Sequence, residues 1–166
     1  MRRKHLCAAL AGALLLVGPA AHAAEPKSGM TPFIPPPPDG WNSPMAPNEV
    51  EDENGLEPSV SQGYGPSKPG EPGALTITMT HPSPHDMAVH FADRTLGPNP
   101  FAPQFVVSRV KVNELDAYLT YDSAEQGGVL EMRVGRILVG IQGGKVTAEQ
   151  IVAFASSIDT GRLLKY

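Results

Sequence analysis

Three histidines lie within ten residues of one another, in the segment MTHPSPHDMAVHFAD. They are His81, His85 and His90. Thioether and carboxylate side chains lie between and beside them, at Met79, Asp86, Met87 and Asp93. Imidazole together with thioether suits copper, and imidazole together with carboxylate suits zinc. A copper or zinc site at His81, His85 and His90 is therefore one functional hypothesis.

The secondary structure expected for this segment weighs against that hypothesis. Ser83 is a suitable N-cap for a helix that continues to about Thr95. On a helix His85 and His90 are five positions apart, so their side chains point in different directions. Asp86 and His90 share a face, as they would on any helix that exposes its polar side to solvent. We favour this solvent-exposed helix over the metal site.

A second candidate site is the segment TPFIPPPPDGW, which contains the only tryptophan. Phe33, Ile34 and Trp41 flank the four prolines 35–38, which favour a stiff polyproline II conformation. Aromatic and proline-rich segments of this kind dock into grooves of partner proteins. Phe33, Ile34 and Trp41 are thus candidate contacts to a partner, and the alternative is a spacer in which the aromatic residues are incidental.

Signatures of catalysis are absent from the sequence. It contains no G-x-S-x-G, no H-E-x-x-H and no carboxylate pair in contrasting surroundings. Gly143, Gly144 and Lys145 precede a helix as in a phosphate-binding loop, but Val146 replaces the Ser or Thr that such a loop requires. We expect no enzyme and no cofactor other than copper or zinc. A small hydrolase, with Ser, His and Asp brought together by the fold, is the third alternative.

The first 23 residues have the layout of a signal peptide. Arg2, Arg3 and Lys4 precede an apolar stretch at 6–17, and A-H-A at 21–23 matches the small-residue rule for cleavage. Twelve apolar residues are too few to span a membrane. We expect a periplasmic or secreted protein, with no transmembrane segment after cleavage. The remaining chain has 10 basic and 17 acidic residues, which excludes nucleic acid as a partner.

Residues 24–73 are rich in proline and glycine, with 12 and 7 of them respectively. Two lysines stand against eight acidic residues. A segment of this composition has too few apolar side chains to offset the entropy of ordering it. It is expected to be a disordered leader before a folded domain at 74–166.

The domain alternates apolar and polar residues at 75–79, 105–112 and 117–121, which predicts strands. The clearest element is the hairpin LEMRV-GR-ILVGI, with Gly135 first in a two-residue type II′ turn. This register places three apolar pairs on one face: Val134 with Ile137, Met132 with Val139, and Leu130 with Ile141.

A helix follows the glycines at 143–144, which are expected to break the strand. Thr147 and Gln150 form a capping box, and Gly161 is expected to end the helix. One apolar stripe would cover the hairpin, formed by Ile151, Phe154, Ala155 and Ile158. The predicted fold class is α+β, a small antiparallel sheet of four or five strands with one or two helices on one face.

The segment RILVGIQGGKVTAEQIVAFASSID resembles the C-terminal strand-strand-helix module of small bacterial cell-envelope domains, both those associated with anti-sigma factors and lipoprotein-carrier-like half barrels. The resemblance implies a binding or sensing role without catalysis. Our hypothesis is an exported, non-catalytic binding or accessory protein of the bacterial cell envelope that contacts an envelope protein. The alternative is a periplasmic copper- or zinc-binding protein.

Overall fold

The computed structural model describes residues 29–50, 57–83, 86–87 and 94–166. The predicted signal peptide lies outside these residues, and so does most of the helix predicted after Ser83, including His85 and His90. The start of that helix is visible, because the backbone N–H of Asp86 donates to the Ser83 hydroxyl. In the described part of the chain, no helix has both the length and the apolar character needed to cross a membrane.

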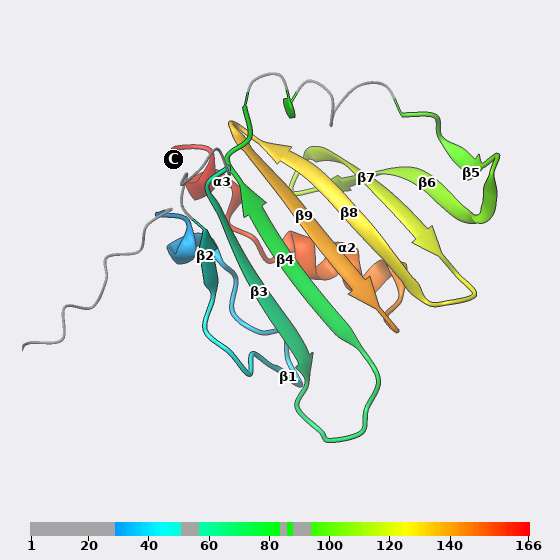
Figure 1. Cartoon of the computed structure of the whole chain (residues 1–166), viewed down its shortest axis with the longest axis horizontal. Coiled ribbons are helices and arrows are strands. Elements are labelled where there is room, and N and C mark those ends of the chain that lie inside the picture. Colours follow the sequence, from blue (N-terminus) through cyan, green and yellow to red (C-terminus); the bar gives the residue numbers. More distant parts are fainter. Residues whose placement is uncertain (1–28, 51–56, 84–85, 88–93) are drawn as a thin grey trace, which may run out of the picture.

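The fold is a large antiparallel sheet, and two short α-helices follow its last strand in the chain (Figure 1). Its nine strands are β1 (Trp41–Asn42), β2 (Asn48–Val50), β3 (Ser59–Pro66), β4 (Ala74–Thr80), β5 (Gly97–Asn99), β6 (Ala102–Val112), β7 (Leu115–Asp122), β8 (Gly127–Val134) and β9 (Ile137–Gly144). Their order is β1-β3-β4-β9-β8-β7-β6-β5, and β2 also pairs with β3. The helices are the 3-10 helix η1 (Thr31–Phe33), α2 (Ala148–Ser156) and α3 (Thr160–Leu163).

The predicted hairpin is confirmed as β8 and β9. Val134 pairs with Ile137, Met132 with Val139, and Leu130 with Ile141, and all six side chains are buried. Gly135 has a φ of 61°, the left-handed value that the first position of a type II′ turn requires. The turn type thus fixes the register, and the register places these three apolar pairs on the core face.

The capping box of α2 is also confirmed, since the Thr147 side chain accepts from Gln150 N–H and the Gln150 side chain accepts from Thr147 N–H. The helix ends at Ser156, however, and Gly161 lies inside α3. Asn113, in the β6–β7 turn, donates to the carbonyl oxygens of Ser156 and Ile158 and so satisfies the end of α2. Asp159 then caps α3.

The expected sheet of four or five strands is too small. The additional strands are β5 and three strands from the segment assigned to a disordered leader. The described parts of that segment, 29–50 and 57–73, are ordered, and β3 pairs along its length with β4. Strand β3 alternates inward Val60, Gln62 and Tyr64 with outward serine and glycine. Val60 and Tyr64 lie four positions apart on the same face, with no proline between them, and these two apolar side chains suffice to join the strand to the sheet.

The core lies between the sheet and the layer formed by α2, α3 and residues 30–41. Met30 is fully buried and anchors the N-terminal end of this layer. The opposite face of the sheet carries short polar side chains, such as Thr76, Thr78 and Gln142. On that face the ring of Tyr118 has two guanidinium groups 5.4 and 5.6 Å from its centroid, those of Arg94 and Arg109.

Candidate functional site

The polyproline segment at residues 35–38 lies on the folded core. Tyr64, on β3, donates its hydroxyl hydrogen to the carbonyl oxygen of Pro35 at 2.6 Å. Its ring packs edge-to-face against Phe154 of α2, with the ring centroids 5.0 Å apart. Burial raises the pKa of Tyr64 from its ordinary value near 10 to about 12.

Residues at the C-terminus contact Pro32 and Phe33, shortly before the polyproline segment. The ring of Tyr166 lies edge-on to Phe33 at 5.4 Å between centroids. Arg162, on α3, places its guanidinium 5.1 Å from the centre of the Phe33 ring and donates to the carbonyl oxygen of Pro32 at 3.4 Å. These contacts join the N-terminal segment to the last turn of the chain.

Phe33, Ile34 and Trp41, the candidate contacts to a partner, all pack against the core of their own domain. Trp41 covers Gly73, where an added Cβ would lie 3.1 Å from the indole ring. These three side chains therefore contribute to the packing of their own domain. Their packing leaves a concave surface beside the prolines.

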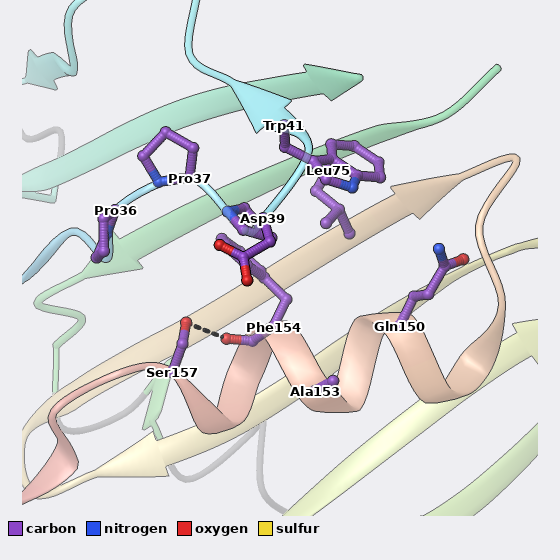
Figure 2. A pocket seen from close by; sticks show the side chains of 10 residues that line it. Pro36, Pro37, Asp39, Trp41, Leu75, Gln150, Ala153, Phe154 and Ser157 are labelled. Carbon is purple, nitrogen blue, oxygen red and sulfur yellow. Dashed lines mark hydrogen bonds between the residues drawn. The ribbon is translucent and has the colours of Figure 1, made fainter. Parts of the chain in front are cut away.

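A groove of about 370 Å³ lies between the polyproline segment and α2 (Figure 2). One wall is the chain from Pro36 to Trp41, and the other is the face of α2 turned toward it. The residues that line the groove are Pro36, Pro37, Pro38, Asp39, Trp41, Leu75, Gln150, Ala153, Phe154 and Ser157.

The groove follows from the residue types on its two walls. Gln150, Ala153, Phe154 and Ser157 are spaced by three, four and seven positions, so they share one face of α2. Ala153 and Ser157 are small, and the Ser157 hydroxyl is turned back to donate to the carbonyl oxygen of Phe154 at 2.6 Å (Figure 2). Prolines have fixed φ angles, which restricts the conformations open to the opposite wall.

The lining is apolar and aromatic with a few polar groups, the usual character of a small-molecule site. Among the described residues that line the groove, Asp39 alone is charged, and Figure 2 shows its carboxylate directed toward α2. In the part of the chain that the structure describes, the lining contains no histidine, cysteine or lysine and no pair of carboxylates. This arrangement can hold a ligand.

A second hollow lies on the other side of the polyproline segment, beneath the loop at 43–47. Its volume is about 460 Å³, and it is more open to solvent than the groove. The buried amide of Gln62 is already engaged there with Ser43 and with the carbonyl oxygens of Met45 and Gly63. Because its polar group is satisfied by the chain, this hollow is a weaker candidate than the groove.

Only one of the three histidines proposed as metal ligands, His81, belongs to the described residues. Its backbone N–H donates to the carbonyl oxygen of Pro58, and its side chain lines a small hollow together with Met87, Arg133 and Arg136. The two arginines that line the same hollow carry positive charges, which oppose the binding of a cation there. Across the described residues, no three His, Cys, Asp or Glu side chains form a group that could hold a metal ion.

The groove was not foreseen from the sequence, although two of its signals are present there. One is the tetraproline with Asp39 and Trp41 beside it, and the other is the small-residue spacing of Ala153 and Ser157 on the last helix. What joins them is the packing of residues 30–41 against α2, which depends on contacts far apart in the sequence.

Comparison with protein-family models, with curated proteins and with solved structures gives no match to this chain.

Proposed function

We propose that this chain is an exported, non-catalytic binding protein of the bacterial cell envelope, and that the groove between the polyproline segment and α2 is its binding site. The groove carries the proposal, because it is a preformed concave surface with aromatic walls and one charged group. Such a surface recognises a ligand or a partner side chain without changing it chemically.

Export is supported by the N-terminal charge, the apolar stretch at 6–17 and the A-H-A sequence at 21–23. We expect the protein to be recovered from the periplasm or the medium with a mass that lacks residues 1–23. Recovery of the uncleaved chain from the cytosol would contradict export and leave the groove as a binding site of another compartment.

Photo-crosslinking in exporting cells tests the binding role directly. A benzophenone amino acid at Pro36 lies on the exposed wall of the groove opposite α2, whereas the same amino acid at Ala124, in the exposed β7–β8 turn, serves as a matched control. We expect a reproducible adduct at position 36 and none at position 124. The proposal fails if position 36 gives no adduct, or if both positions give the same adducts.

A further inference from the structure

We propose that the groove selects a ligand with a short apolar body and one cationic end, of the kind that an aliphatic amine represents. This inference rests on the proposed function, because it assigns a ligand class to the same groove. Three features of the lining support it: the single negative charge, the aromatic faces and the limited volume.

The charge of the groove is negative and uncompensated. Asp39 forms no ion pair within the described part of the chain, and no cationic side chain lines the groove. Cationic side chains of neighbouring elements are engaged elsewhere: Lys68 with Glu71, Lys145 with Glu125, and Arg162 with Phe33. A carboxylate beside an apolar surface attracts a cation and repels an anion of the same shape.

The aromatic residues favour the same ligand. Trp41 and Phe154 both line the groove, and an ammonium group near an indole or phenyl face gains a cation–π attraction. The apolar body can pack on Leu75 and on the rings of the three prolines at 36–38. A volume of about 370 Å³ restricts this body to a short chain or a single ring.

The strength of the preference for a cationic over an uncharged ligand depends on how exposed Asp39 is to solvent. Because the carboxylate is exposed, water and salt weaken its attraction to a cation. Added to a cation–π contact, it gives an expected preference of about tenfold for an amine over an uncharged molecule of the same length.

Three probes of equal length test this preference at neutral pH: n-hexylamine, 1-hexanol and hexanoate. Trp41 is the only tryptophan and lines the groove, so its fluorescence reports binding without a label. We expect n-hexylamine to bind about tenfold more tightly than 1-hexanol, and hexanoate to bind least. Asp39→Asn should lower the affinity for n-hexylamine toward that for 1-hexanol, because only the cation–π contact then favours the amine, and it should leave the affinity for 1-hexanol unchanged.

Two further variants distinguish failure of the proposed ligand class from failure of the groove as a binding site. Asp116→Asn removes a carboxylate that pairs with Lys111 and does not line the groove, and it should leave all three affinities unchanged. Ala153→Phe fills the groove from an exposed helix position and should abolish binding of all three probes. Equal binding of the three probes, or a preference for the amine that Asp39→Asn does not reduce, would overturn the ligand class while the groove remained a binding site. Absence of any binding would count against the proposed function itself.

Discussion

Tyr64 shows how one side chain joins the polyproline segment to the sheet. It is 4% exposed, donates to the carbonyl oxygen of Pro35 and supports Phe154 at the base of the groove. Removing its hydroxyl leaves a buried carbonyl oxygen without its donor. We expect Tyr64→Phe to lower the free energy of unfolding at neutral pH by about 1–3 kcal/mol, measured by urea denaturation.

The same residue gives a pH dependence with a definite sign. An unfolded tyrosine loses its proton near pH 10, whereas Tyr64 in the folded protein has a pKa of about 12. Its contribution is therefore complete below about pH 10 and is lost as the pH rises toward 12. The gap in stability between the native protein and Tyr64→Phe should narrow over this range. A gap that stays constant would contradict the burial of the phenol.

The histidines set a second test at the scale of residues. Because Arg133 and Arg136 line the same hollow as His81, we expect the imidazole of His81 to contribute little to metal binding. A variant carrying His81→Ala, His85→Ala and His90→Ala should bind zinc and copper with the same affinity as the native chain in calorimetric titrations. A loss of affinity in the variant that follows the ionisation of histidine would restore the metal-binding alternative.

At the scale of elements, the end of β9 and the helix that follows it depend on one glycine. The sequence pattern predicted a break at 143–144, but β9 runs through Gly144. A Cβ at Gly143 would lie 2.5 Å from Cγ2 of Val146 and 2.7 Å from Cδ1 of Ile151. Glycine at this position lets α2 approach the sheet closely.

Two adjacent alanine variants separate packing from chain flexibility. Gly143→Ala should destabilise the protein by about 1–3 kcal/mol through overpacking. Gly144→Ala meets no atom within 4 Å and should leave the stability unchanged or slightly raised. Thermal unfolding of the pair is the measurement, and equal effects of the two substitutions would refute the close approach.

The elements that the sequence predicted well are those with local signals. The β8–β9 hairpin is specified by Gly135 and its flanking apolar pairs, and the start of α2 by Thr147 and Gln150. Strand β3 was missed because its inward residues Val60 and Tyr64 are separated by serine, glutamine and glycine, which average to a polar composition. Composition describes a whole segment, whereas pairing with β4 needs only the alternating positions.

At the scale of the whole molecule, the N-terminal segment is part of the fold. A chain beginning at Ala74 lacks β3, and with it Val60, Tyr64 and the cover that Met30 provides. Circular dichroism should show that this truncated chain has no cooperative thermal transition, whereas a chain beginning at Ala24 unfolds cooperatively. Identical unfolding temperatures for the two chains would show that β4 to α3 fold independently.

The groove exists only in the assembled molecule, since its walls come from the N-terminal segment and the last long helix. The most direct test is a pair of ¹H–¹⁵N correlation spectra of the protein, recorded with and without n-hexylamine. We expect the largest shifts at the indole N–H of Trp41 and at the backbone amides of Ala153 and Ser157, and none of these shifts in Ala153→Phe. Shifts centred on the hollow at residues 43–47 or on the opposite face of the sheet would contradict the assignment of the groove as the binding site.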